Sequence, residues 1–269
     1  MRKNIFCSLI FLSFFLHPKN LFSQDTSAAN AKQKMLIIPF APKMYMSEID
    51  LYISQETKMT FPQMWNDFRN SLNAALYIQF KEKYLPVSLL SDTSKTNSDI
   101  QFIYQNIGYK YDAVPDTSAN KGSHKKSSDT HQMVNGQVNT DVNSQPGFMN
   151  TDILNQQLLP FLHKKYHTDV FIFINELDIK HVLKSDADMT TSPDIYDREM
   201  TVQYSIFDKS GKEITEGISS TRFPDSLNNP KKIEGLCYPK ICRAIFNDYQ
   251  RATKIQASKK TTPDLLHQK

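Results

Sequence analysis

The sequence predicts one α/β sandwich domain with a mixed sheet, helices packed on that sheet, and a C-terminal β-hairpin followed by a helix. Three observations lead to this fold class. The run DVFIFINE at 169–176 has the continuous apolar content of a central strand that is covered on both faces. Apolar residues recur at helical spacing between 60 and 84. Two alternating segments flank the turn-forming sequence DKSG at 208–211.

The first half of the chain opens with a strand and a long helix. The sequence KMLIIPF at 34–40 is a short apolar run of the buried-strand kind, and Pro39 closes it because proline cannot donate to a continuing ladder. Thr60 and Pro62 supply a capping residue and an early proline, which favour a helix start. The apolar stripe extends this helix to about Tyr84.

Shorter elements follow the long helix. Residues 86–90 predict a second strand, and 98–107 predict a short helix because their isoleucine and tyrosine side chains share one side. Residues 151–166 predict another helix, which Pro160 breaks or restarts.

The second half of the chain is richer in predicted strands. The central strand at 169–176 is expected to run on toward Leu183, and the segments 198–207 and 213–223 predict an antiparallel hairpin around the turn. A closing helix is predicted from Pro239 to about Gln256, because its apolar residues fall on or near one stripe.

The first 23 residues predict a secretory signal peptide. Arg2 and Lys3 precede an apolar run at 5–16, and a polar stretch then leads to the small residue Ser23, after which we expect cleavage. The run is shorter than the roughly 20 residues that cross a hydrocarbon core, which argues against a permanent membrane anchor. The mature protein is therefore expected to be exported.

Three further segments are predicted to be flexible. The stretch 112–147 has only valine and methionine as large apolar residues and contains no aromatic residue, so it cannot bury enough surface to offset its ordering entropy. We expect it to be a disordered insertion, and we expect 24–33 and 257–269 to be flexible as well. The α/β domain would then span 34–256.

Charge and hydropathy narrow the classes of partner. The formal net charge is +4, and the predicted leader holds three basic residues and no acidic residue, so the mature chain would carry only one net positive charge. Binding to nucleic acid is not expected, because it needs a concentrated basic face. After the leader, no segment approaches the length of a transmembrane helix.

The sequence also resembles known envelope proteins. The segments MLIIPFAPKMYMSEID, FINELDIK and YSIFDKSGKEITEGISSTRF resemble a group of uncharacterised exported proteins from the Bacteroidetes. The order of elements resembles the small α/β domain of the TolB amino-terminal type, which is similar to domains in lipoprotein activators of penicillin-binding proteins and in curli-export-type lipoproteins. The resemblance implies a cell-envelope location and a protein partner. It implies no activity, and this chain lacks the lipidation cysteine of those lipoproteins.

The sequence contains few candidates for chemistry. His163 and His167 have the i, i+4 spacing of many zinc sites, but the glutamate of a metalloprotease motif is missing, so a polar helix end is favoured. A solvated loop is favoured over a calcium site for the three nearby aspartates Asp186, Asp188 and Asp194. No catalytic residue, metal or cofactor is predicted.

Cys237 and Cys242 admit two interpretations. If the last helix starts at Pro239, the two residues lie on either side of that start and a disulfide becomes possible in an oxidising compartment. The alternative is a pair of buried free thiols that pack against the sheet.

The segment 41–57 is the best candidate for a binding surface. It leaves the end of the first strand, where open α/β sheets tend to form ligand crevices. We expect its polar and aromatic side chains to project from the sheet end and to contact another protein; they are Lys43, Tyr45, Ser47, Asp50 and Tyr52. The alternative is a long connection that folds back over the sheet edge.

These observations favour an exported, non-enzymatic cell-envelope protein that binds a protein partner in the periplasm or at the outer membrane, or that is secreted beyond it. The favoured interpretation depends on the fold resemblance and on the sparse catalytic signals. The alternative is an exported hydrolase or metal-dependent enzyme whose site is assembled from Asp and His residues by folding. Oligomeric state is not predicted.

Overall fold

The structure, a computed structural model, describes residues 32–113, 147–184 and 196–261. Contacts within the chain group these residues into one compact unit. Several expectations from the sequence lie outside the described residues: the leader, most of 24–33, nearly all of the insertion 112–147, the three aspartates between 186 and 194, and the end of the C-terminal tail.

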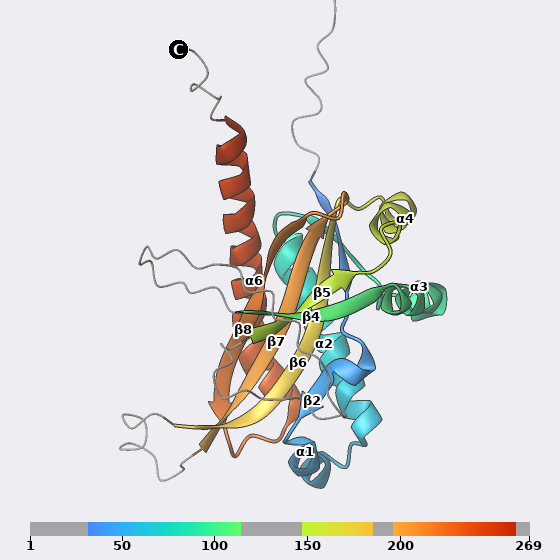
Figure 1. The fold of residues 1–269 in the computed structure, drawn as a ribbon. Helices are drawn as coiled ribbons and strands as arrows, with labels where there is room; N and C mark the ends of the chain where they lie inside the picture. Colours follow the sequence, from blue (N-terminus) through green and yellow to red (C-terminus); the bar gives the residue numbers. More distant parts are fainter. Residues whose placement is uncertain (1–31, 114–146, 185–195, 262–269) are drawn as a thin grey trace, which may run out of the picture. The chain divides into compact units, whose positions relative to one another are not determined.

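The elements follow one another as Figure 1 shows. In chain order they are β1 (Lys34–Ile38), the short 3-10 helix η2 (Pro42–Met44), β2 (Tyr45–Ser47), α1 (Asp50–Thr57), α2 (Phe61–Lys81), β3 (Leu85–Ser88), α3 (Thr93–Gln105), β4 (Ile107–Ala113), β5 (Gly147–Ile153), α4 (Leu158–Tyr166), β6 (Val170–Leu183), β7 (Tyr196–Asp208), β8 (Glu213–Pro224) and α6 (Pro230–Thr261).

The main sheet is mixed, as the sequence predicts. Its strand order is β3-β1-β6-β7-β8, with β1 parallel to both β3 and β6, whereas β6, β7 and β8 are antiparallel to one another. The short strand β2 pairs in parallel with the second half of β6. The predicted fold class is therefore confirmed, including the C-terminal hairpin and its closing helix.

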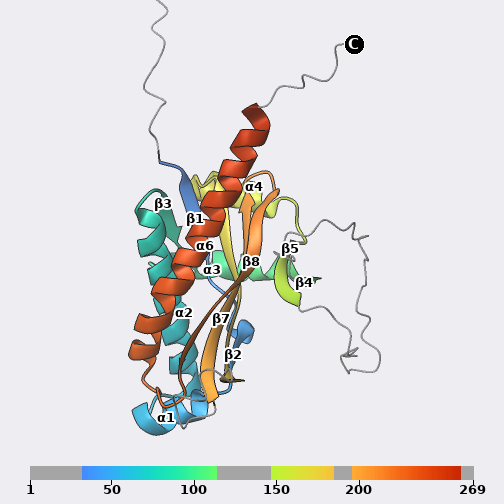
Figure 2. The same ribbon diagram turned by 90° about the vertical axis from the view of Figure 1, so that its left-hand side faces the viewer.

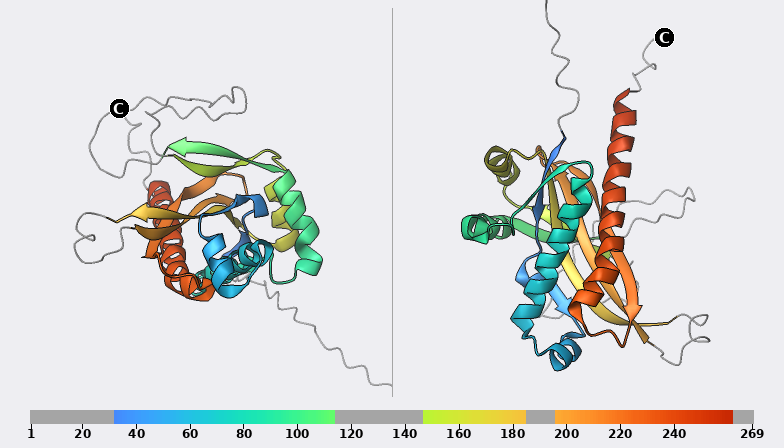
Figure 3. Two further views of the ribbon diagram at one scale, coloured as in Figure 1. Left: turned by 90° about the horizontal axis from the view of Figure 1, so that it is seen from below. Right: turned by 180° about the vertical axis from the view of Figure 1, so that it is seen from behind.

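Helices cover both faces of this sheet. Helices α2 and α6 lie side by side on one face, and the opposite face carries α3, α4 and a second, two-stranded sheet of β4 and β5 (Figures 2 and 3). Two clusters of buried apolar residues fill the layers on either side. No helix among the described residues is long and apolar enough to cross a membrane.

The strongest local signals form the expected elements. Residues 170–177 of β6 are buried throughout, as a strand covered on both faces requires. Helix α2 starts with a capping interaction, because the Thr60 backbone N–H donates to Gln63 Oε1 at 2.8 Å. In the hairpin turn Gly211 adopts φ 83°, and its N–H donates to the Asp208 carbonyl at 3.1 Å.

The strands β4 and β5 correct the sequence-based helix at 151–166. They pair in antiparallel register from Ile107 opposite Ile153 to Ala113 opposite Gly147, and α4 begins only at Leu158. Strand β5 packs against β6 and β7, where Phe148 is fully buried. This contact between distant segments stabilises strand conformation where local periodicity alone indicated a helix.

Helix α6 also differs from the expectation, because it begins at Pro230 and continues through Pro239. Ile233 and Ile241 are both fully buried on either side of the proline. Pro239 cannot donate a backbone hydrogen bond within the helix. Burial of the apolar stripe outweighs the lost backbone donor.

Candidate functional site

The predicted binding segment 41–57 is mostly regular structure. It contains η2, β2 and α1, and β2 extends the sheet by pairing Tyr45 with Leu177 of β6. Its residues therefore have defined directions rather than those of a projecting loop.

Tyr45 faces the core, so the expectation that it projects from the sheet end is wrong. Its ring stacks with those of Phe40 and Phe68, at centroid distances of 6.4 and 5.9 Å. Its hydroxyl donates to Asp50 Oδ1 at 2.7 Å. Burial, together with the Asp50 carboxylate, raises the pKa of Tyr45 well above its usual value. Tyr45 and Asp50 thus form one structural contact.

The remaining predicted residues have separate environments. Lys43 is exposed, and Ser47 Oγ accepts a hydrogen bond from the Ile49 backbone N–H at 3.3 Å. Tyr52 of α1 is 45% exposed, and its ring contacts His181 and Arg198. Of the five predicted residues, Tyr52 is the one that is exposed and also contacts charged side chains, those of His181 and Arg198.

His181 is the centre of this charged network. Its Nδ1 lies 3.3 Å from Glu48 Oε2 and its Nε2 lies 3.2 Å from Asp225 Oδ1, while the Tyr52 ring packs edge-on at 6.0 Å. The His181 backbone N–H also donates to Glu48 Oε2 at 2.7 Å, and this bond holds the pKa of Glu48 below its usual value. The β2–α1 turn, α1 and the β8–α6 connection therefore meet at His181 of β6.

Arg198 is paired with His181 across β6 and β7 and is almost fully buried, with 2% exposure. Its Nε donates to Asp225 Oδ1 at 3.0 Å, and its Nη1 donates to the Leu227 carbonyl at 2.9 Å and to Asn228 Oδ1 at 2.8 Å. The Tyr52 ring lies over the guanidinium, 5.2 Å from Cζ. Arg198 thereby attaches the β8–α6 connection to the sheet.

Exposed apolar side chains continue from this network toward the strand ends. Leu183 and Tyr196 pair directly, two residues beyond His181 and Arg198, so they lie on the same face of the sheet. Leu183 is 59% exposed and Tyr196 is 48% exposed. We name Tyr52, His181, Leu183, Tyr196 and Arg198 the distal surface; α1 supplies Tyr52, and β6 and β7 supply the other four residues.

Sequence reasoning missed most of the distal surface. Glu48 and His181 are 133 residues apart, and His181 and Asp225 meet only because β7 and β8 return the chain to the end of β6. No spacing in the sequence signals such a contact.

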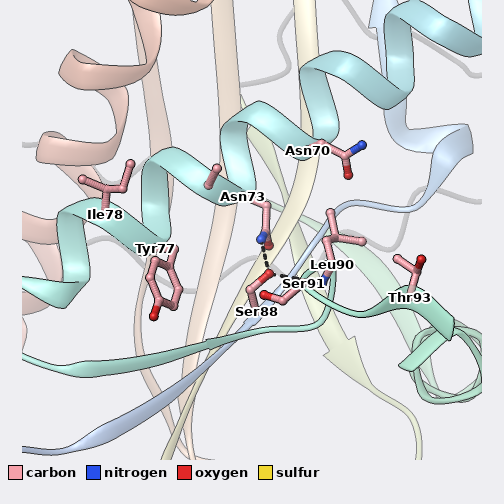
Figure 4. Close-up of a pocket in the computed structure, with 9 residues that line it drawn as sticks. Asn70, Asn73, Tyr77, Ile78, Ser88, Leu90, Ser91 and Thr93 are labelled. Atoms are coloured by element: carbon pink, nitrogen blue, oxygen red, sulfur yellow. Dashed lines mark hydrogen bonds between the residues drawn. The ribbon is translucent and has the colours of Figure 1, made fainter. Parts of the chain in front are cut away.

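A pocket with a volume of about 500 Å³ lies beside the edge strand β3 (Figure 4). Helix α2 provides one wall, and the end of β3 with the following turn provides the other. The lining residues are Asn70, Asn73, Ala74, Tyr77, Ile78, Ser88, Leu90, Ser91 and Thr93. The α2 residues recur at i, i+3, i+4, i+7 and i+8, so they share one helix face, and this spacing is visible in the sequence.

A third polar cluster joins the β4–β5 sheet to β8. The Asn150 side chain is fully buried, and its Nδ2 donates to Asp112 Oδ2 at 2.8 Å, to Glu213 Oε2 at 3.2 Å, and to Glu216 Oε2. Burial and the adjacent Glu213 carboxyl group raise the pKa of Glu216 to about 8. Glu216 is therefore expected to hold a proton at neutral pH.

The Glu216 contact predicts a pH dependence of stability. The folded protein binds a proton that the unfolded chain has released, so stability should fall as pH rises from about 4.5 toward 8. Glu216→Gln cannot ionise and should flatten this decline. Because Glu216 is partly solvated, we expect a gain of about 1 kcal/mol above pH 8, or ~2–4 °C in Tm.

Thermal unfolding from pH 5 to 9 measures this effect, with Glu56→Gln as the control because Glu56 is an exposed carboxylate on α1. The difference in Tm between Glu216→Gln and the native chain should grow with pH, whereas Glu56→Gln should leave the curve unchanged. Parallel curves for Glu216→Gln and the native chain would contradict the raised pKa of Glu216.

His163 and His167, the pair with the spacing of a zinc site, lie at the C-terminal end of α4. His163 Nδ1 lies 2.8 Å from the Thr168 carbonyl, whereas His167 ends α4 in a left-handed conformation with φ 54°. In the part of the chain that the structure describes, no three His, Cys, Asp or Glu side chains are placed to hold a metal ion.

Cys237 and Cys242 both lie within α6 as buried free thiols, and burial raises the pKa of Cys237 to about 12.

No protein-family model matches this sequence, and no curated protein is significantly similar to it.

Proposed function

We propose that this protein is an exported, non-enzymatic component of the cell envelope that binds a protein partner through the distal surface, in the periplasm or at the outer membrane. The leader-like sequence at 1–23 supports export. The single observation that carries the proposal is the set of exposed large side chains Tyr52, Leu183 and Tyr196 beside a fixed arginine and histidine.

The composition of the distal surface is suited to protein binding. Tyrosine is enriched among the residues that dominate interface energies, and an apolar patch beside charged groups is typical of a binding surface. Arg198 is buried and supports the Tyr52 ring rather than the partner. Arg198 and His181 are held by several contacts each, so little side-chain freedom would be lost on binding.

The geometry of His181 favours binding over catalysis. Both ring nitrogens lie within 3.3 Å of carboxylate oxygens, so a substrate would have to displace a carboxylate to reach either nitrogen. A hydrolase mechanism on this histidine would require the network to separate first.

Site-specific photocrosslinking tests the proposal. A photoreactive phenylalanine analogue is placed at Tyr196 in the full chain, and the same analogue at Ile255 serves as the control, because Ile255 is 49% exposed near the C-terminal end of α6, away from α1 (Figure 1). Crosslinking in intact cells should give a discrete protein adduct in envelope fractions from position 196 and not from position 255.

A second variant separates binding from folding. Leu183→Ala should remove most of the adduct at position 196 while it changes Tm by only a few degrees, consistent with about 1 kcal/mol or less for a surface substitution. An equal adduct from both positions, an adduct that survives Leu183→Ala, or no envelope adduct would overturn the proposal.

A further inference from the structure

The pocket between α2 and β3 shares no residue with the distal surface. It opens beyond the C-terminal end of β3, which is parallel to β1 and β6. In open α/β sheets, crevices outside the carboxyl ends of parallel strands are frequent ligand sites. The volume of about 500 Å³ falls within the range of small-molecule pockets.

The pocket contains an unsatisfied polar group. Asn73 is 4% exposed and its Nδ2 donates to Ser88 Oγ, yet its Oδ1 has no hydrogen-bond partner. Buried polar atoms without partners are rare and costly. Figure 4 shows the two side chains approaching one another from α2 and β3.

Ser88 completes a pair of complementary groups. Its oxygen accepts hydrogen bonds from Asn73 Nδ2 and from the Leu90 backbone N–H at 3.1 Å, so its own hydroxyl hydrogen is available to donate. An acceptor on Asn73 and a donor on Ser88 therefore lie side by side. A hydroxyl group matches both, because it donates and accepts at once.

The remaining lining residues restrict the charge and shape of a ligand. None of the nine is charged, whereas Asn70, Ser91 and Thr93 add amide and hydroxyl groups. Tyr77 is partly exposed, and Lys81 Nζ lies over its ring at 5.8 Å from the centroid, so a ligand would pack on the other face of the ring. Ile78 adds exposed apolar surface. A charged ligand would lose its hydration without an opposite charge to replace it.

We propose that this pocket binds a neutral sugar, with ring hydroxyl groups bonded to Asn73 and Ser88 and the apolar face of the sugar ring packed on Tyr77. Because Asn73 Oδ1 is covered by its neighbours, this binding mode requires the Asn73 amide group to turn toward the pocket when a hydroxyl group enters. This ligand supplies the missing partner of Oδ1 without placing a charge in the pocket.

The test is an amide-resolved NMR titration of the full chain with defined probes. Methyl glucoside and N-acetylglucosamine are the neutral sugars, glucuronate and glucose 6-phosphate are charged counterparts, and an acetylated, amidated dialanine is a neutral peptide. The neutral sugars should shift the amide signals of residues 70–78 and 88–93, and they should bind more tightly than the charged sugars and the peptide.

Two pocket variants and one matched control complete the test. Asn73→Leu and Tyr77→Ala should each weaken binding about tenfold. Asn66→Leu, on the same helix but outside the pocket, should leave binding unchanged. Tyr77→Ala keeps the test decisive if Asn73→Leu fails to fold. No shift in the two segments, tighter binding of a charged sugar or the peptide, or full affinity in Tyr77→Ala would overturn the proposal.

Discussion

Tyr45→Ala is expected to lower the free energy of unfolding by about 3 kcal/mol, which corresponds to a fall in Tm of ~6–12 °C. The Tyr45 ring contacts Phe40 and Phe68, and its hydroxyl bonds to Asp50, so truncation leaves a cavity and an unpaired carboxylate. Tyr45→Phe keeps the ring and should cost only about 1 kcal/mol.

Urea unfolding followed by circular dichroism measures both Tyr45 variants, with Lys43→Ala as the control because Lys43 is exposed beside the same strand. Lys43→Ala should change stability by less than about 0.5 kcal/mol. If Tyr45→Ala were as stable as Lys43→Ala, the inward position of the ring would be incorrect.

Arg198→Met is expected to destabilise the protein by about 3 kcal/mol. Methionine keeps part of the side-chain volume but removes three hydrogen bonds, and it leaves the Leu227 carbonyl and Asn228 Oδ1 without the guanidinium donor. Arg198→Lys should be intermediate, since one ammonium group cannot reproduce the planar set of donors.

Arg222→Met provides the matched comparison for Arg198→Met. Arg222 lies on β8, its side chain is 48% exposed, and its Nε is 3.6 Å from Glu199 Oε1. Removing such an exposed pair should cost less than about 1 kcal/mol. Equal stability of the two methionine variants in denaturant titration would contradict the structural role of the buried guanidinium.

The two largest errors in the sequence-based fold have the same cause. Residues at the start of 151–166 form part of β5 because they pair with β4, and the pairing joins segments on either side of the predicted insertion. Helix α6 passes through Pro239 because Ile233 and Ile241 are buried against the core. In both places, contacts between distant parts of the chain override a local signal.

The candidate site was only partly predictable. Tyr52 belongs to the segment that the sequence singled out, and it lies on the distal surface. Tyr45 and Asp50 belong to the same segment but bond to each other, with the Tyr45 ring packed against the core. The sequence shows that aromatic and acidic residues follow β1, but it does not show which of their side chains point toward the core.

The sequence by itself determined the elements whose signals act over a few residues: the buried run of β6, the capped start of α2 and the turn at Gly211. Periodicity and turn geometry are local properties of the backbone, so they can be read without knowledge of the partners. Only the tertiary structure decided which polar groups meet. Strand register brings His181 to Arg198, and the packing of α2 beside β3 leaves the Asn73 amide in a pocket with one unsatisfied oxygen.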